Sequence, residues 1–110
     1  MQAAGDRTYP WGDKFDSALA NTEESNLGQT TPVHMYRDGK TPEGVWDLAG
    51  NVWEWTCDDD GDKSNLFYYL KGGAYYRDAT GVTSAARYGW DPGSWNGYDG
   101  FRVVVVPISR

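Results

Sequence analysis

Hydrophobic residues in this chain gather in short runs that polar, glycine-rich stretches separate. The densest run covers residues 44–55 and contains three tryptophans. Each tryptophan carries roughly 150–250 Å² of largely apolar surface, so this run is not a solvated loop. Two glycines and an asparagine interrupt it, which argues against a long helix. We therefore predict a compact turn over residues 47–51 that leads into a core strand over residues 52–56.

Further short runs predict four more extended segments, at residues 66–71, 74–77, 84–88 and 101–107. The last contains four consecutive valines and is the clearest strand of the sequence, because β-branched residues favour the pleated conformation. Polar, turn-rich residues separate these segments, and the pattern indicates strands joined by long loops.

Composition supports a small domain of this kind. The chain has 110 residues, of which 15% are aromatic and 14 are glycine. This length suits a single domain, and the balance favours a loop-rich fold whose core is built from a few large rings. The formal net charge of −6 argues against nucleic-acid binding, because there is no basic stripe to neutralise phosphates. No apolar run approaches the roughly 20 residues of a membrane span. A single cysteine, Cys57, excludes an intrachain disulfide.

Several short motifs follow one another along nearly the whole chain. They are Tyr-Pro-Trp-Gly-Asp at 9–13, Thr-Pro-Val at 31–33, Asp-Leu-Ala-Gly-Asn-Val-Trp-Glu-Trp-Thr at 47–56, Lys-Gly-Gly-Ala-Tyr at 71–75, Ser-Ala-Ala-Arg at 84–87 and Gly-Phe-Arg-Val at 100–103. In this order they resemble the formylglycine-generating-enzyme (sulfatase-modifying factor) domain over residues 3–106. The resemblance implies an α+β class of the C-type lectin fold, minimal, with a small antiparallel sheet and long irregular loops.

Two departures from the family pattern bear on activity. Residues 2–5 resemble the end of the N-terminal half of family members, so residues 1–110 are expected to form one C-type-lectin-like domain without that half. The family's enzymes carry a cysteine pair shortly after a Gly-Gly-Ser-Trp motif, and the corresponding residues 72–80 contain no cysteine. We therefore predict that the protein is not an enzyme. The alternative is a fragment or relative of a formylglycine-generating oxidase that acts on sulfatases.

A non-catalytic branch of the resemblance fits better. Variable proteins of diversity-generating retroelements have the same fold and a hypervariable stretch between Gly-Gly and a Gly-Phe-Arg-like close. Residues 75–99 have the expected composition, rich in Tyr, Asp, Ser, Asn and Gly. Tyrosine supplies large contact area at low entropic cost, and small polar residues adapt their hydrogen bonds, as in antibody paratopes. A sugar-binding lectin is less favoured, because the Glu-Pro-Asn and Gln-Pro-Asp calcium signatures are absent.

The predicted ligand-binding face lies within this stretch. Its members are Tyr76, Arg77, Asp78, Tyr88, Trp90, Asp91, Ser94, Trp95, Asn96, Tyr98 and Asp99. The two tryptophans are also candidates for the scaffold, because adenine changes in an Asn codon do not produce a Trp codon. The same alternative applies to the whole face, since large rings also fill cores.

The resemblance also implies a calcium site, with Asp47, Gly50, Val52 and Glu54 as ligands by position. Oxygen atoms from carboxylates and carbonyls suit this hard cation. The alternative for Glu54 is a buried salt bridge to Arg87 or Arg102, because a charge between two tryptophans needs a partner. Binding itself requires no cofactor, and calcium is the one candidate.

Together these observations predict a non-enzymatic variable protein whose C-terminal loop face recognises a protein or glycan ligand. A homo-oligomer or a companion chain is expected to help cover the small core. Nucleic acid and a membrane span are excluded as partners. The sequence leaves the location open, with a virion or cell surface among the locations that the resemblance implies.

Overall fold

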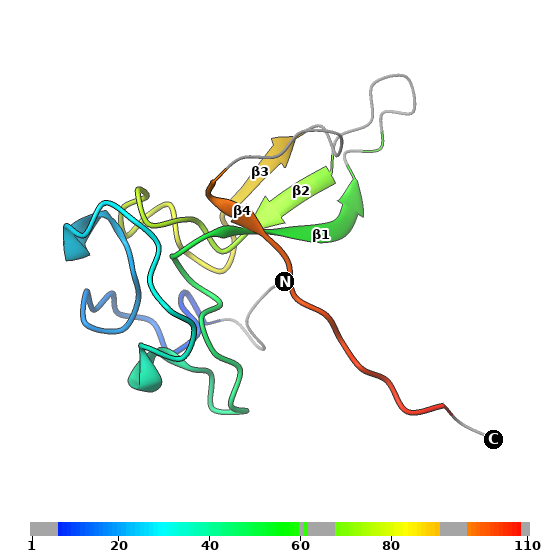
Figure 1. Ribbon diagram of the computed structural model, residues 1–110, viewed down its shortest axis with the longest axis horizontal. Helices are drawn as coiled ribbons and strands as arrows, with labels where there is room; N and C mark the ends of the chain where they lie inside the picture. The colour runs from blue at the N-terminus through cyan, green and yellow to red at the C-terminus, as the bar shows by residue number, and fades with distance from the viewer. Residues whose placement is uncertain (1–6, 60, 62–67, 91–96, 109–110) are drawn as a thin grey trace.

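The computed structural model describes residues 7–59, 61, 68–90 and 97–108. It contains a four-stranded sheet and two short 3-10 helices, η1 (Glu23–Ser25) and η2 (Arg37–Gly39), joined by long irregular segments. Figure 1 shows the sheet at one end of the molecule and the irregular N-terminal segments at the other. This confirms the predicted class of a small sheet with little helix. No helix in these ranges has the length and apolarity that crossing a bilayer requires.

The sheet has the strand order β3-β2-β1-β4. Its strands are β1 (Trp53–Asp59), β2 (Tyr68–Lys71), β3 (Arg87–Trp90) and β4 (Asp99–Gly100). β2 is antiparallel to both β1 and β3, whereas β4 is parallel to β1. The sheet is therefore mixed and not wholly antiparallel. β3 and β4 run in the same direction and form the opposite edges of the sheet.

Of the five predicted strands, two are present and three are corrected. β1 overlaps the strand predicted over residues 52–56 but begins at Trp53 and continues to Asp59, and β2 matches the described part of residues 66–71. The strand predicted over 84–88 begins only at Arg87, because a turn closed by the Ala86 amide and the Thr83 carbonyl precedes it. The prediction of an extended segment at 74–77 is wrong. Those residues form a turn, in which the Arg77 amide donates to the Ala74 carbonyl at 3.0 Å.

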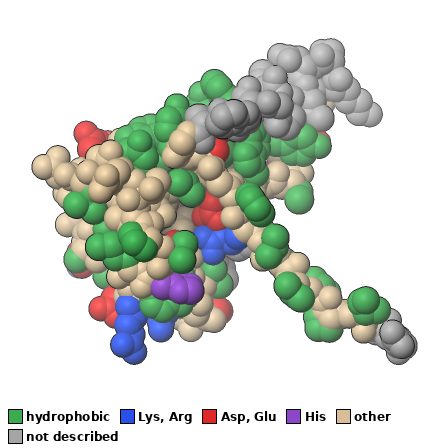
Figure 2. Space-filling model, viewed as in Figure 1, with side chains coloured by type: hydrophobic (Ala, Val, Ile, Leu, Met, Phe, Trp, Pro, Cys, Tyr) green, Lys and Arg blue, Asp and Glu red, His purple; other side chains and the backbone are tan. Residues whose placement is uncertain are grey.

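The prediction of a strand over residues 101–107 is also wrong. Beyond β4 the chain leaves the sheet as an extended tail, and residues 103–108 have no hydrogen bond to any described residue. The large apolar side chains of this tail are between 70% and 89% exposed. Figures 1 and 2 show it running away from the body of the molecule, with hydrophobic side chains along its length. β propensity alone does not make a strand, because a strand also needs a neighbour to pair with.

The predicted turn before β1 is present, and three of its residues have left-handed backbone, Asp47 with φ +58° and the adjacent pair Gly50 and Asn51. Gly50 has φ +74° and Asn51 has φ +67°. The Gly50 amide donates to the Gly72 carbonyl at 2.7 Å, and the Asn51 amide donates to the Asn21 carbonyl at 2.9 Å. The Asn51 side chain accepts from the Thr31 amide at 2.8 Å and from the Asn21 amide group at 3.2 Å. The Gly-Asn pair of the motif thus ties the irregular N-terminal segments to the sheet.

Buried apolar side chains form two small clusters. One joins Tyr9, Ala20, Ala49 and Val82, with Trp11 and Phe15 packed against it. The other joins Trp53 of β1, Leu70 of β2 and Ala74, with the partly buried Trp55 and Trp90 packed against it. The second cluster confirms that the tryptophan-rich run anchors the core, and it lies directly beside the predicted ligand-binding face.

Candidate ligand-binding site

A shallow pit with aromatic walls opens beside β3 and β4. It has a volume of about 50 Å³ and is lined by Trp53, Tyr76, Tyr88, Trp90, Tyr98 and Asp99. We call this feature the aromatic pit. The side chains of Tyr76, Tyr88 and Tyr98 are 42%, 45% and 37% exposed, so they present ring surface to the solvent.

Local structure explains how these residues come together. Tyr88 and Trp90 are two residues apart on β3 and therefore point to the same face of the sheet. Trp53 begins β1, and its amide donates to the Tyr98 carbonyl at 2.7 Å, which brings the start of β4 alongside. Tyr76 arrives from the turn that follows Gly72 and Gly73, whose φ values of +92° and +72° redirect the chain.

The rings contact one another in the offset and edge arrangements that aromatic pairs prefer. Tyr88 stacks on Trp90 with centroids 5.4 Å apart and lies 5.9 Å from Trp53. Tyr76 meets Tyr98 edge to face at 5.0 Å and Tyr75 at 5.8 Å. The walls of the pit are thus held by mutual contact rather than by single exposed side chains.

Hydrogen bonding distinguishes the two indoles of the pit. Trp53 is 2% exposed, and its Nε1 donates to the Tyr76 hydroxyl at 2.9 Å. Tyr76 therefore has a structural role as well as an exposed ring. The Nε1 of Trp90 is buried and has no acceptor in the described part of the chain. An unpaired buried donor is costly, which marks this position as one that a ligand could satisfy.

Five of the predicted ligand-binding residues line the pit: Tyr76, Tyr88, Trp90, Tyr98 and Asp99. Arg77 lies beside it, with its guanidinium carbon 5.7 Å from the centroid of the Trp53 ring. The predicted residues Asp91, Ser94, Trp95 and Asn96 lie outside the described residues. Sequence reasoning missed Trp53 as a wall of the pit and assigned it to the core alone. Only its place at the start of β1, where it also meets Tyr76 and Tyr88, shows that it does both.

Asp78 is placed differently from the other predicted residues. Its Oδ1 accepts hydrogen bonds from the Thr80 amide, the Thr80 hydroxyl and the Gly81 amide, and so closes the turn at 78–81. These bonds, first that from the Thr80 hydroxyl and then that from the Gly81 amide, lower the pKa of the Asp78 carboxyl. The carboxylate is therefore occupied with local structure and does not line the pit.

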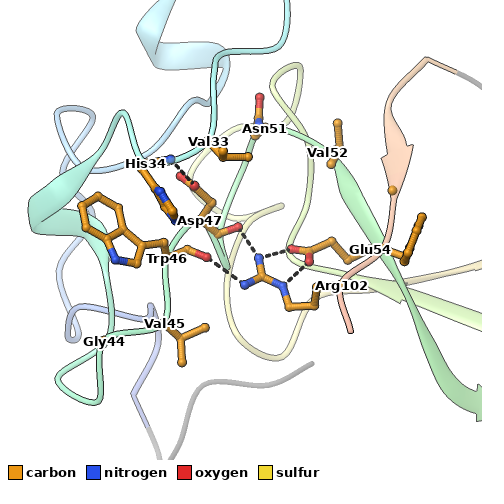
Figure 3. A pocket seen from close by; sticks show the side chains of 12 residues that line it. Val33, His34, Gly44, Val45, Trp46, Asp47, Asn51, Val52, Glu54 and Arg102 are labelled. Carbon is orange, nitrogen blue, oxygen red and sulfur yellow. Dashed lines mark hydrogen bonds and ion pairs between the residues drawn. The ribbon is translucent and has the colours of Figure 1, made fainter. Parts of the chain in front are cut away.

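A second and larger cavity, of about 550 Å³, lies where the tail leaves the sheet (Figure 3). Its walls include Glu54, which is buried, and Arg102. The guanidinium of Arg102 donates through Nε and Nη2 to the two carboxylate oxygens of Glu54. It also donates to the Trp46 carbonyl at 2.9 Å and the Asp47 carbonyl at 3.0 Å. Of the two partners considered for Glu54, the structure selects Arg102, whereas Arg87 lies over the Tyr69 ring at 4.3 Å.

Three of the four residues predicted for calcium, Asp47, Val52 and Glu54, line the same cavity, whereas Gly50 is not among its lining residues. Asp47 Oδ2 accepts from the His34 amide at 2.9 Å, and Val52 lines the cavity. Both oxygens of Glu54 accept from Arg102, so a cation bound by Glu54 would share these oxygens with a positively charged guanidinium. Within the described ranges, no three His, Cys, Asp or Glu side chains converge as a metal cluster. Calcium binding through Asp47, Gly50, Val52 and Glu54 stays a prediction.

Comparison with known proteins places this geometry in a family. Residues 2–107 match the sulfatase-modifying factor enzyme 1-like domain. The chain is 32% identical to serine/threonine-protein kinase pkn1 of Chlamydia caviae, over 86% of this chain and 17% of that protein. It is 31% identical to the formylglycine-generating enzyme of Streptomyces coelicolor, over 87% and 40%. It is 28% identical to inactive C-alpha-formylglycine-generating enzyme 2 of Bos taurus, over 87% and 36%.

The chain spans less than half the length of each of these relatives. Among solved structures, Treponema denticola variable protein 1 superposes with a TM-score of 0.74 at 21% identity, over 90% of this chain and 41% of that one. This likeness shows the fold. Because the family match covers nearly the whole chain, the protein belongs to the sulfatase-modifying factor enzyme 1-like domain family and has its C-type-lectin-like fold.

Proposed function

We propose that this protein is a non-enzymatic binding module, a variable protein of a diversity-generating retroelement, whose aromatic pit and surrounding loops recognise a protein or glycan ligand. The observation that carries the proposal is the exposed ring cluster. Three half-exposed tyrosines gather at one site, all of them from residues 75–99. Rings held by a rigid scaffold at a surface are typical centres of binding energy.

The fold supports this division of labour. The strands β1 and β2 and the Gly50-Asn51 turn supply the anchor, through contacts that lie mostly outside residues 75–99. Side chains at the pit can then change without removing the hydrogen bonds that hold the sheet. Variable protein 1 of Treponema denticola has the same fold.

The variable-protein reading is tested in the DNA next to the coding sequence. We expect a near-copy of the codons for residues 75–102 beside a reverse-transcriptase gene, differing mainly at adenines. The absence of such a copy would contradict this part of the proposal and leave the binding role to be judged separately.

Binding is tested with a displayed random-peptide library and a glycan array, using wild type and the variants Tyr88→Ala and Tyr98→Ala. We expect selected ligands to lose most of their affinity for both variants while the melting temperature changes little, because these rings are exposed. Tyr76→Ala is a separate case, since it removes the acceptor of the buried Trp53 indole and should also cost stability. A large loss of stability in all three variants would assign the rings to the core.

The second candidate is a formylglycine-generating oxidase or a fragment of one, which the relative in Streptomyces coelicolor favours. The sequence at 72–80 offers no cysteine pair, and Cys57 lies exposed on β1. We expect no conversion when the protein is incubated with a cysteine-containing sulfatase peptide and copper, measured by mass spectrometry. Formation of the aldehyde would make the protein an enzyme.

A homo-oligomer or companion chain also belongs to the proposal. The exposed apolar tail supports it, because its row of unpaired backbone groups and valines is a surface on which another strand can add. Sedimentation of the intact chain and of a chain lacking residues 103–110 tests this. If the intact chain sediments with the mass of a monomer at all concentrations, this would contradict the proposed homo-oligomer.

A further inference from the structure

The indole of Trp90 carries a hydrogen-bond donor that the described part of the chain does not satisfy. Its Nε1 is buried and has no acceptor there, whereas the neighbouring indole of Trp53 donates to the Tyr76 hydroxyl at 2.9 Å. A buried donor without an acceptor is costly, so a ligand that brings an acceptor gains by satisfying it. The ligand group that enters the aromatic pit should therefore present an oxygen that accepts a hydrogen bond.

Other polar groups of the pit are already engaged. The Tyr76 hydroxyl accepts from Trp53, and Asp99 has an interaction partner of its own within the chain. The described lining residues therefore supply no free carboxylate and no amide side chain to receive donors from a ligand. The pit favours a ligand group that accepts hydrogen bonds and brings few donors of its own.

The aromatic rings add a second requirement. Tyr88 stacks on Trp90 with centroids 5.4 Å apart, and Tyr76 meets Tyr98 edge to face at 5.0 Å. The three tyrosines are between 37% and 45% exposed, so part of each ring is open to a ligand. The faces of aromatic rings carry negative potential, which complements C–H groups that a neighbouring amide makes partly positive. A compact saturated ring beside an amide meets this requirement.

Proline combines both features. It has no backbone N–H, and its saturated ring is bonded to the amide nitrogen. In a polyproline II segment the carbonyls make no internal hydrogen bonds and remain available as acceptors. A sugar fits less well, because each hydroxyl brings a donor as well as an acceptor, and the described lining has no free carboxylate or amide for those donors.

From these observations we infer that the aromatic pit binds a proline-rich segment of a protein ligand in the polyproline II conformation. The inference rests on the proposed binding function of this face and specifies its ligand. A proline ring packs against the exposed tyrosine rings, and a carbonyl of the segment accepts from Trp90 Nε1. Because Nε1 is covered in the free protein, binding includes a small displacement of the Tyr88 ring, which stacks on Trp90 and is half-exposed. The preformed conformation of such a segment keeps the entropic cost of binding low, which suits a shallow site.

The test uses hexaproline with acetylated and amidated ends, which is uncharged and adopts polyproline II. A blocked Gly-Ser peptide of the same length is the flexible control, and maltohexaose is the glycan control. The indole N–H resonances report binding by nuclear magnetic resonance. We expect a saturable shift of the Trp90 resonance with hexaproline and a dissociation constant roughly tenfold lower than for either control, because hexaproline is preorganised. Equal affinities for the two peptides, or tighter binding of maltohexaose at the same resonance, would overturn the inference.

Variants separate the hydrogen bond from the ring surface. Trp90→Phe keeps an aromatic ring without the donor and should weaken hexaproline binding about fivefold, which corresponds to one net hydrogen bond. Tyr88→Leu should weaken it to a similar extent through the loss of ring surface. Trp46→Phe is the matched control, because Trp46 is also partly buried but lines the larger cavity, and it should leave hexaproline binding unchanged.

Equal hexaproline affinity of Trp90→Phe and Trp46→Phe, with both folds intact by thermal melting, would contradict the inference. If Trp90→Phe does not fold, the wild-type protein decides the question. An accepted hydrogen bond moves the Trp90 indole proton downfield, and the absence of a downfield shift at saturating hexaproline would overturn the inference.

The outcome distinguishes this inference from the proposed function. Selected peptides that depend on Tyr88 and Tyr98 but contain no proline would overturn the inference and leave the binding role standing. If neither the selected ligands nor hexaproline depended on these two tyrosines, both the inference and the proposed binding face would be wrong.

Discussion

The ion pair between Glu54 and Arg102 offers the sharpest test of how the fold is held together. Arg102 connects three parts of the chain: the start of the tail, the carboxylate in β1 and the carbonyls of Trp46 and Asp47. Replacing Arg102 by Met keeps the length of the side chain and removes its charge. The change leaves a buried carboxylate without a counter-charge and deprives two carbonyls of their donor.

The expected loss follows from burial. Removing one member of a fully buried pair costs about 3–5 kcal/mol of unfolding free energy. The Glu54 side chain is 10% exposed and the Arg102 side chain 27% exposed, so solvent screens part of the effect. We expect Arg102→Met to cost about 2–3 kcal/mol, against a total stability of about 5–15 kcal/mol. The melting temperature should fall by about 10 °C.

Urea unfolding followed by tryptophan fluorescence measures this loss, with Arg87→Met as the matched control. Arg87 is exposed and only covers the Tyr69 ring, so its removal should cost less than about 1 kcal/mol. A double-mutant cycle with Glu54→Leu should give a coupling energy of about 1–3 kcal/mol. Equal losses for the two arginine variants, or additive effects in the cycle, would refute the role of the pair.

Three further predictions concern the scaffold. Gly50→Ala should lower the free energy of unfolding in urea by several kcal/mol, because the new Cβ would lie 2.3 Å from the Asn21 carbonyl oxygen. Gly28→Ala, which has a similar φ and open space around the new Cβ, should cost only about 1–2 kcal/mol. Equal losses for the two variants would contradict the steric argument. The pKa of Asp78 is lowered in the folded state. The stability that its ionised carboxylate contributes is therefore complete above the unfolded pKa and is lost as pH falls through the folded pKa. Asp78→Ala should melt at a lower temperature than wild type near neutral pH and at the same temperature in acid. A difference that persists unchanged at the lowest pH would disprove this linkage. Deleting residues 103–110 should leave the melting temperature of the monomer unchanged in differential scanning fluorimetry. The reason is that residues 103–108 have no hydrogen bond to the described residues and their large apolar side chains are mostly exposed. A clear fall in the melting temperature would contradict this prediction.

The Glu54–Arg102 ion pair and the aromatic pit have different roles in the structure. The ion pair ties distant segments together, so changes there should act on stability. The aromatic pit presents side chains whose rings are half-exposed, so changes at Tyr88 and Tyr98 should act on binding. This separation is what a protein with a changeable binding surface requires.

The sequence by itself determined the anchor and the family. The tryptophan-rich run predicts a core anchor, and the structure buries Trp53 and packs the partly buried Trp55 against it. The Gly-Asn pair predicts a turn before β1, and the structure contains that turn with positive φ at both residues. The strands β1 and β2 were predictable for a local reason as well, because each is a short run of apolar and aromatic residues next to a turn. These features depend on interactions between residues close together in the chain, which can be recognised from the sequence.

Tertiary structure decided the rest. Residues 101–107 have the strongest strand propensity, yet residues 103–107 form no hydrogen bond with the described residues, because pairing needs a partner strand and propensity cannot supply one. The choice of Arg102 over Arg87 for Glu54, and the double role of Trp53 in core and pit, depend on which segments lie beside β1 in the folded chain. Such contacts join residues far apart in sequence, and their geometry is settled only when the whole chain packs.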